Sequence, residues 1–458
     1  MHPDLIQRAR WVAGTAGGLM ILVALLADEL GLDHSPNFGA GETLLLIAGV
    51  GVLAVALAGP RFQTLYRGAA ILLLNTLVVI GVLELTLIAY STLTGTSLAP
   101  TGLIDSLSDH YRGLSYYAAK EWGEQYWDEN DRGAAQHYQP YVGWRTAPFA
   151  GETLNVDNDG IRRTPDTACD QPTAYKIFIL GGSAMWGWGA PDWGTIPAYL
   201  QVELAARREE PVCVVNLGEN AFVSDQELVE LVVRLRAGER PDLVIFYDGV
   251  NDVLAAHETG RPGLHQNFRL IAGRIEGTPG PLLAWLQQLN TVQLAYRLTR
   301  GREARKRDRA PIDAPVLAGK IVDNYLGLAD VVDGLAQSYG FDVLFFWQPY
   351  ILMGGKPLTA EERAIVESLD MILELEPDLA DLYTETYRRI AAQVSQRERL
   401  EDLSGLFDTE EGLLWIDTWG HVTPVGNKIV ARAMVPFIVE QWPVGDPRQQ
   451  GPAPPVGR

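Results

Sequence analysis

Basic residues are scarce in this chain. Its 458 residues include 37 lysines and arginines against 57 aspartates and glutamates, which gives a formal net charge of −20. Nucleic acid is bound through a basic surface, so we expect no affinity for it. Cysteine is scarcer still: two occur, neither in a Cys-x-x-Cys pair, which excludes a disulfide-built scaffold and a structural zinc site. We therefore expect no metal and no cofactor.

Long apolar runs, in contrast, are concentrated near the N-terminus. Three stretches with almost no charge cover residues 11–27, 43–60 and 68–91. Each approaches the roughly 20 residues that a helix needs to cross the hydrocarbon core of a membrane. The sequence therefore predicts a membrane domain of three transmembrane helices within residues 1–95.

Positive charges predict the orientation of these helices. The basic residues beside the apolar runs are Arg8, Arg10, Arg61 and Arg67, whereas the loop 28–42 has none. By the positive-inside rule the N-terminus is cytoplasmic, and everything after the third run lies outside. We expect a protein of the inner (plasma) membrane whose C-terminal three-quarters is periplasmic or extracellular.

Two features of the apolar runs allow other interpretations. The first run could be a signal peptide, but Leu25-Leu26-Ala27 lacks the small-x-small cleavage pattern. Glu84 within the third run is a functional candidate, or else a carboxylate that reaches the membrane interface.

Outside the cytoplasm Cys169 and Cys213 can form a disulfide, the alternative being buried free thiols.

The exported part begins with an aromatic-rich connector, residues 96–170. Its tyrosines and tryptophans include Tyr116, Tyr117, Trp122, Tyr126, Trp127, Tyr138, Tyr141 and Trp144. Such side chains can stack on sugar rings, but we favour packing of the connector onto the following domain or contact with the membrane interface.

A regular alternation follows over residues 171–442. Short continuous apolar runs predict strands at 176–180, 212–215, 243–247 and 343–347, with helices between them. One helix is expected to begin at Ser224, where Ser224-x-x-Glu227 forms a capping box. This alternation predicts an α/β fold with a parallel sheet covered on both faces, whose ligands bind at the carboxyl ends of the strands.

Two segments of this part do not follow the alternation. An insertion at about 257–315 carries Arg297, Arg300, Arg302, Arg305, Lys306, Arg307 and Arg309. It could meet lipid headgroups or an anionic glycan, but we favour a solvated helix face. The tail 443–458 is rich in proline and glycine, and we expect it to be disordered.

Polar residues suited to catalysis follow the predicted strands. The first strand ends in Gly181-Gly182-Ser183, a tight turn that exposes the Ser183 hydroxyl. It is not the G-x-S-x-G elbow, because Met185 stands at the second glycine, and it lacks the Gly-Lys-Ser/Thr ending of a phosphate loop. The third strand leads to Asn251.

A histidine loop lies near the C-terminus. His421 alone among seven histidines follows an acid, Asp417, at short spacing on the C-terminal side of a predicted strand. Thr423 can cap a helix whose first residue is Pro424, which fixes His421 on the preceding loop.

Together these motifs resemble the SGNH (GDSL-like) hydrolase family. The serine block looks like Gly181-x-Ser183-x-x-x-Gly187, the third block like Gly249-x-Asn251-Asp252, and the last block like the segment 417–427. The resemblance covers residues 171–442 and implies a flavodoxin-like parallel-sheet domain.

The resemblance also implies the roles of individual residues. Ser183, His421 and Asp417 would form the catalytic triad. The oxyanion hole would consist of the backbone N–H groups of Ser183 and Ala221 and the side-chain amide of Asn251. Asp252 would fix the loop that presents Asn251.

Three positions depart from the family pattern. Gly182 replaces the most common aspartate, and Ala221 stands where the oxyanion glycine is usual. Thr418 occupies the usual place of the acid, three residues before the histidine, so that Asp417 is one residue farther away.

The implied activity is that of a membrane-anchored serine ester hydrolase that removes acyl (acetyl) groups from an envelope glycan or lipid. One alternative is an O-acyltransferase that modifies an exopolysaccharide or cell-wall glycan with the same triad. Another is a catalytically idle glycan-binding assembly protein. The partners expected are an acylated glycan or lipid substrate, the membrane and proteins of envelope polysaccharide biosynthesis.

Overall fold

We describe the chain from a computed structural model. The described residues are 3–25, 40–58, 62–94, 110–266, 268, 271–272, 289–292, 294, 312–373 and 378–442. They fall into two compact units: residues 1–103 with 269–307, and residues 104–268 with 308–458. The tail 443–458 and the arginine-rich part of the predicted insertion lie outside the described residues.

The first unit contains three apolar helices, α1 (Pro3–Leu25), α2 (Ala40–Leu57) and α3 (Phe62–Thr94). Two stretches of described helix are long and apolar enough to cross a membrane, Gln7–Leu25 and Arg67–Tyr90. The prediction of three spans is wrong by this criterion. In α2 the apolar part is Leu45–Leu57, about 20 Å long at 1.5 Å per residue, whereas the hydrocarbon core is about 30 Å thick.

Helices α1 and α2 form a closely packed antiparallel pair. A Cβ atom built on Gly17 would lie 2.9 Å from the Gly49 carbonyl oxygen, so only glycine permits this approach. At the other end Arg10 Nε donates to the Ala56 carbonyl oxygen at 3.0 Å. The helix pair is therefore held by backbone contact and a hydrogen bond.

Glu84 in α3 binds the start of a helical turn in the same unit. Its Oε1 accepts the Asn290 backbone N–H at 2.7 Å and Nδ2 at 2.8 Å, and its Oε2 accepts the Thr291 N–H at 2.9 Å. A carboxylate stabilises a helix N-terminus because the first N–H groups there have no intrahelical acceptor. Glu84 thus acts as a cap.

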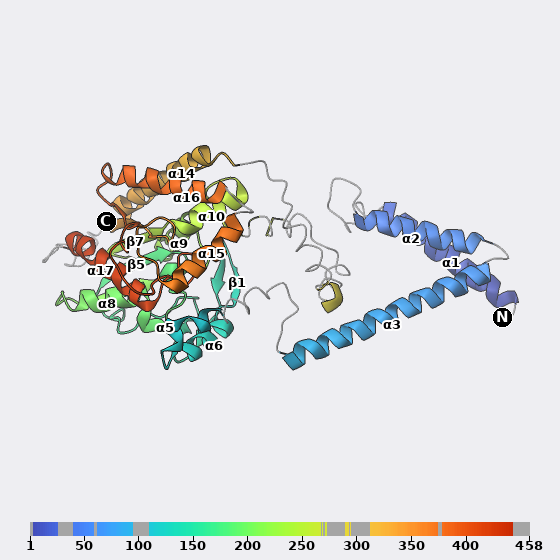
Figure 1. Cartoon of the computed structure of the whole chain (residues 1–458). Coiled ribbons are helices and arrows are strands. Elements are labelled where there is room, and N and C mark those ends of the chain that lie inside the picture. The colour runs from blue at the N-terminus through green and yellow to red at the C-terminus, as the bar shows by residue number, and fades with distance from the viewer. Residues whose placement is uncertain are drawn as a thin grey trace. The chain divides into compact units, whose positions relative to one another are not determined.

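The second unit is built on a five-stranded parallel sheet, which confirms the predicted α/β class. Its strands stand in the order β6-β5-β7-β8-β9, which is the 2-1-3-4-5 order of flavodoxin-like folds; Figure 1 labels the neighbouring strands β5 and β7. Their bounds are β5 (Tyr175–Gly181), β6 (Val212–Asn216), β7 (Leu243–Asp248), β8 (Asp342–Trp347) and β9 (Leu400–Asp402). Strand β7 is buried along its whole length, as the apolar run Leu243–Tyr247 predicts, and Asp248 at its end is buried as well.

Two groups of helices cover the sheet. On one side α8 (Ile196–Ala205) packs on α17 (Pro424–Gln441). The other group, on the opposite side of the sheet in Figure 1, consists of α9 (Ser224–Ala237), α10 (Val250–Thr259), α14 (Ala314–Tyr339) and α16 (Asp378–Val394). The helix α15 (Ala360–Leu373) precedes α16. This doubly wound arrangement leaves the loops after β5, β6 and β7 at one edge of the sheet.

The start of α9 differs from the predicted capping box. Gln226 Oε1, and not Glu227, reaches back to the N-terminal end of the helix, where it accepts the Val223 N–H at 3.3 Å. The Ser224 hydroxyl donates instead to Asp252 Oδ1 at 2.6 Å. Tertiary contacts of Ser224 and Glu227 thus override the local motif.

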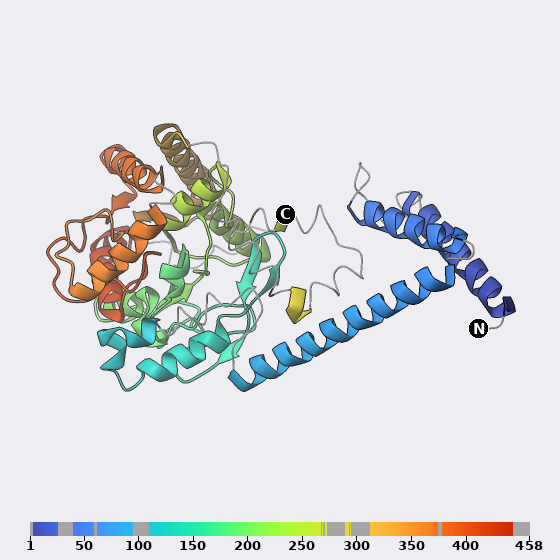
Figure 2. The same ribbon diagram turned by 45° about the vertical axis from the view of Figure 1, so that its right-hand side comes forward.

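The described part of the connector, residues 110–170, belongs to the same unit as the sheet (Figure 1, Figure 2). It contains α5 (Ser115–Ala118), α6 (Gly123–Gly133), β1 (Gln136–Gln139), β2 (Gly143–Thr146), β3 (Phe149–Ala150) and β4 (Asn155–Val156). Most of its aromatic side chains pack into a cluster with Trp186. Tyr138 and Tyr141, which are 77% and 75% exposed, do not.

Candidate active site

The nucleophile candidate stands just after β5, which lies between β6 and β7 in the sheet. Ser183 is the first residue of α7 (Ser183–Trp186), two residues after β5. An N–H at the start of a helix has no intrahelical acceptor, so the Ser183 backbone can donate to a ligand. Its side chain is half-buried and remains accessible to a substrate.

The structure brings Ser183 and His421 into hydrogen-bond contact across 238 positions of the chain. The Ser183 Oγ lies 2.6 Å from His421 Nε2. The other ring nitrogen, Nδ1, lies 2.5 Å from Asp417 Oδ2. With Nδ1 protonated, the imidazole donates to the carboxylate and can accept the serine proton at Nε2. This is the arrangement of a general base that a carboxylate orients.

The loop between Asp417 and His421 explains how an acid four residues away reaches the imidazole. The Ile416 N–H donates to the His421 carbonyl oxygen at 3.1 Å, which closes the loop. Gly420 takes the left-handed conformation (φ 86°) that the turn requires. Asp417 Oδ1 accepts the N–H groups of Trp419 and His421 at 2.8 and 3.2 Å, so the carboxylate is anchored within its own loop.

Side chains from other segments enclose these two residues. The Trp188 ring lies on the His421 ring, with centroids 5.9 Å apart and planes 28° from parallel. Tyr111 donates its hydroxyl to Asp417 Oδ2 at 2.8 Å. Both His421 and Asp417 are 6% exposed, so their interaction is largely shielded from water. Neither Tyr111 nor Trp188 was predicted from the sequence, because no local pattern links them to Asp417 or His421.

Of the predicted oxyanion donors, Ala221 lies on the loop after β6, and Asn251 is the second residue of α10, directly after β7. Ala221 adopts a left-handed conformation (φ 62°), which is unusual for a residue with a Cβ atom. The Asn251 Nδ2 donates one hydrogen to the Phe222 carbonyl oxygen at 2.8 Å. An amide nitrogen carries two hydrogens, so one remains available for a substrate oxygen.

Gly182 has a steric role beside Asn251. A Cβ atom at position 182 would lie 2.2 Å from Asn251 Nδ2. Glycine therefore admits the Asn251 amide next to Ser183, and the departure from the family aspartate fits the observed geometry.

The connector fixes the loop that carries Ala221. Thr146 in β2 donates its N–H and hydroxyl to the Glu219 carboxylate, both at 2.8 Å. Trp144 Nε1 donates to the Asn220 carbonyl oxygen at 2.8 Å. Burial raises the pKa of Glu219, and the charge of the Arg145 guanidinium partly counteracts this rise. These contacts hold the residues that precede Ala221.

The structure contains the disulfide that was one of the two expectations for the cysteines. Cys169 and Cys213 are bonded, and this links the end of the connector to β6. Asp252 accepts hydrogen bonds from the Ser224 N–H and hydroxyl at 3.2 and 2.6 Å, which ties the start of α10, where Asn251 lies, to the start of α9.

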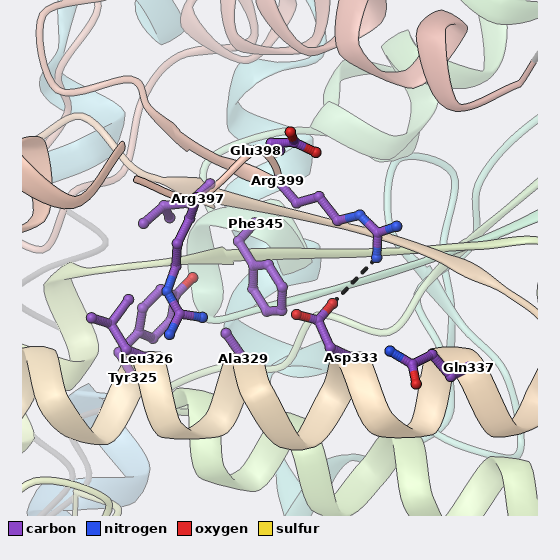
Figure 3. Close-up of a pocket in the computed structure, with 10 residues that line it drawn as sticks. Tyr325, Leu326, Ala329, Asp333, Gln337, Phe345, Arg397, Glu398 and Arg399 are labelled. Carbon is purple, nitrogen blue, oxygen red and sulfur yellow. Dashed lines mark hydrogen bonds and ion pairs between the residues drawn. The ribbon is translucent and has the colours of Figure 1, made fainter. Parts of the chain in front are cut away.

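A hollow of about 350 Å³ lies between α14 and the strands β8 and β9, and none of its lining residues belongs to the candidate triad or oxyanion set (Figure 3). Its two arginines are paired with acids of α14: Arg397 with Asp330 at 2.8 Å and Arg399 with Asp333 at 3.3 Å. Because their charges are balanced, the hollow offers no net attraction for an anion.

Fold and site together define an α/β protein with a serine–histidine–aspartate arrangement at the carboxyl ends of a parallel sheet. No family model and no curated protein matches the chain. Among solved structures it is similar to TesA, with 16% identity and a TM-score of 0.30 over 58% of this chain and 98% of that one.

Two further solved structures have comparable scores. Axe2, an acetylxylan esterase from Geobacillus stearothermophilus, is 16% identical with a TM-score of 0.30 over 59% of this chain and 95% of that one. A member of the lipolytic protein G-D-S-L family from Veillonella parvula is 11% identical with a TM-score of 0.30 over 57% and 97%. The family expected from the motifs is thus represented among the structural neighbours. At such low identities and scores, the activity proposed below rests on the geometry of the site.

Proposed function

We propose that this chain is a membrane-anchored serine ester hydrolase that removes acyl groups, acetyl in particular, from an envelope glycan or lipid. The observation that carries the proposal is the pair of contacts made by His421, 2.6 Å to Ser183 Oγ and 2.5 Å to Asp417 Oδ2. A serine hydroxyl is a weak nucleophile until a base within hydrogen-bond reach accepts its proton.

The reaction proceeds in two halves. Ser183 Oγ attacks the ester carbonyl while His421 takes the hydroxyl proton, and Asp417 stabilises the imidazolium. The tetrahedral oxyanion receives the N–H groups of Ser183 and Ala221 and the free amide hydrogen of Asn251. His421 then protonates the leaving alcohol, and water repeats the sequence to release the acid and restore Ser183.

The anchor in this proposal is α3. Arg67 lies in its second turn, and no lysine or arginine follows before Arg112, so the positive-inside rule directs the C-terminal end of α3 outward. The antiparallel pair α1–α2 brings Arg10 close to Ala56, which keeps the basic N-terminus on the same side as Arg67. An exported second unit agrees with the disulfide Cys169–Cys213, since disulfides persist in oxidising compartments.

Fluorophosphonate labelling of the full chain in detergent tests the serine. We expect the wild type to be labelled and Ser183→Ala to be unlabelled, because the reagent needs the activated hydroxyl. Thr195→Ala, which alters a buried helix-capping hydroxyl, is the matched control and should label normally. An unlabelled wild type would favour an idle glycan-binding protein.

Product analysis separates the remaining possibilities. Hydrolysis of p-nitrophenyl acetate but not of long-chain esters would support deacetylation, whereas rates that rise with chain length would indicate a lipid. Acetyl transfer to an added sugar, with little free acetate formed, would replace the hydrolase by an O-acyltransferase.

A further inference from the structure

Tyr111 contacts the candidate triad from a distant part of the chain. It lies in the connector, more than 60 residues before β5, yet its hydroxyl is 2.8 Å from Asp417 Oδ2. This is the same carboxylate oxygen that lies 2.5 Å from His421 Nδ1. Together with the two N–H groups on Oδ1, all the acceptor positions of the carboxylate are used.

The position of the Tyr111 ring is well determined by its surroundings. The ring is 2% exposed and stacks on Trp127 of α6, with centroids 4.5 Å apart and planes 9° from parallel. Burial, and secondly the Asp417 charge, raises the pKa of Tyr111 well above its ordinary value. The hydroxyl therefore stays protonated and is a donor over the whole working pH range.

Two other buried tyrosines face the same region but bind elsewhere. The Tyr117 hydroxyl donates to the Gly189 carbonyl oxygen at 2.5 Å, and the Tyr350 hydroxyl donates to the Thr418 carbonyl oxygen at 3.1 Å. Burial raises the pKa of both tyrosines, so both are neutral. Tyr111 is thus the tyrosine whose hydroxyl contacts Asp417.

We propose that Tyr111 is a positioning residue of the triad, which holds Asp417 Oδ2 against His421 so that the connector completes the catalytic machinery. This inference rests on the proposed function. The hydrogen bond from the Tyr111 hydroxyl draws negative charge from Asp417 Oδ2 and fixes the direction in which this oxygen faces His421 Nδ1. Without it Asp417 Oδ2 holds more charge toward the imidazole, which favours protonated His421. The direction of Oδ2 is also less firmly fixed, because only the two N–H groups on Oδ1 and the imidazole still hold the carboxylate.

The test compares Tyr111→Phe with Tyr117→Phe, which removes a buried hydroxyl from the same aromatic cluster without touching Asp417. With p-nitrophenyl acetate and the full chain, we expect Tyr111→Phe to lower kcat about tenfold and leave KM within twofold. The acid limb of its pH–kcat/KM profile should move to higher pH. Tyr117→Phe should leave that limb in place.

A double-mutant cycle with Asp417→Asn tests whether the effect of Tyr111→Phe on kcat is transmitted through Asp417. If Tyr111 acts through Asp417, Tyr111→Phe will have little further effect in the Asp417→Asn background, whereas independent losses that multiply would overturn the inference. A labelled, active wild type whose acid limb is unmoved in Tyr111→Phe would overturn this inference alone. A wild type that neither labels nor hydrolyses the ester would overturn the proposed function and this inference with it.

Discussion

Three carboxyl groups are buried close together near the start of α10, where Asn251 lies. Glu227 in α9, Asp248 at the end of β7 and Asp252 in α10 are each less than a tenth exposed. Burial raises the pKa of all three, and neighbouring carboxylates raise the pKa of Glu227 and Asp248 further. The pKa of Asp252 is raised from 3.8 to about 6, although hydrogen bonds from Ser224 lower it.

A raised pKa in the folded state makes stability depend on pH. Below about pH 4 the Asp252 carboxyl group is protonated in the folded and in the unfolded chain, and its contribution to the free energy of unfolding is intact. Between about pH 4 and pH 6 the unfolded chain ionises and the folded protein does not, so stability falls as the pH rises. The shift from 3.8 to about 6 corresponds to about 3 kcal/mol at 1.36 kcal/mol per unit.

We predict that Asp252→Asn removes this loss. The asparagine carbonyl oxygen can accept both Ser224 hydrogen bonds, and any cost of its buried amide hydrogens is the same at every pH. Relative to wild type, the variant should gain about 3 kcal/mol in unfolding free energy between pH 4 and pH 7. For a domain of this size that is a relative Tm change of about 6 °C.

The change can be measured by intrinsic tryptophan fluorescence on heating the detergent-solubilised chain at several pH values. Glu124→Gln, on the exposed side of α6, is the matched control and should follow the wild-type curve. If the Tm difference between Asp252→Asn and wild type is constant from pH 4 to pH 7, the assignment of a buried, protonated Asp252 is wrong.

Two further predictions concern stability near the site. Ala221→Gly relieves a left-handed conformation that costs a non-glycine residue about 1–2 kcal/mol, and the greater chain entropy of unfolded glycine offsets about 0.5–1 kcal/mol of this gain. The Tm of the variant should therefore rise slightly. Its kcat/KM should stay within threefold of wild type, since the proposed donor is a backbone N–H. A fall in kcat/KM of more than tenfold would contradict this account. Replacing Cys169 and Cys213 by serine and alanine opens a loop with a sequence separation of 44, whose closure is worth about 4 kcal/mol by loop entropy. The Tm of the variant should therefore fall, and a reductant should lower the Tm of the wild type similarly. If neither change affects Tm, the disulfide does not stabilise the fold.

The sheet could be predicted from the sequence because its strands are continuous apolar runs. The predicted strands at 176–180, 212–215, 243–247 and 343–347 all lie within observed strands. Strand β9 could not be found in this way, since Leu400–Asp402 is only three residues long and two of them are acidic. Its place is set by pairing with β8, which is a tertiary effect.

The candidate site could be predicted only where its residues belong to local motifs. Ser183 and Asn251 stand in short motifs directly after predicted strands, and His421 stands directly before a recognisable helix cap. Tyr111 has no such signal, because its contact with Asp417 spans 306 positions. The cap of α9 was wrongly assigned to Glu227 for a related reason: local spacing cannot reveal that this side chain is buried beside Asp248.

The clamp of strand β2 on the Glu219 carboxylate has a practical consequence for dissecting this protein. A shortened polypeptide starting at residue 171 would retain all five parallel strands, yet it would strip Glu219 of both Thr146 hydrogen bonds and of the Arg145 charge. Glu219 would then keep the Asn220 N–H at 2.8 Å, and the loop two residues before Ala221, whose N–H is a proposed oxyanion donor, would lose its contacts with the connector. Shortened versions should instead begin before residue 110, so that the connector and the sheet domain are produced in one polypeptide.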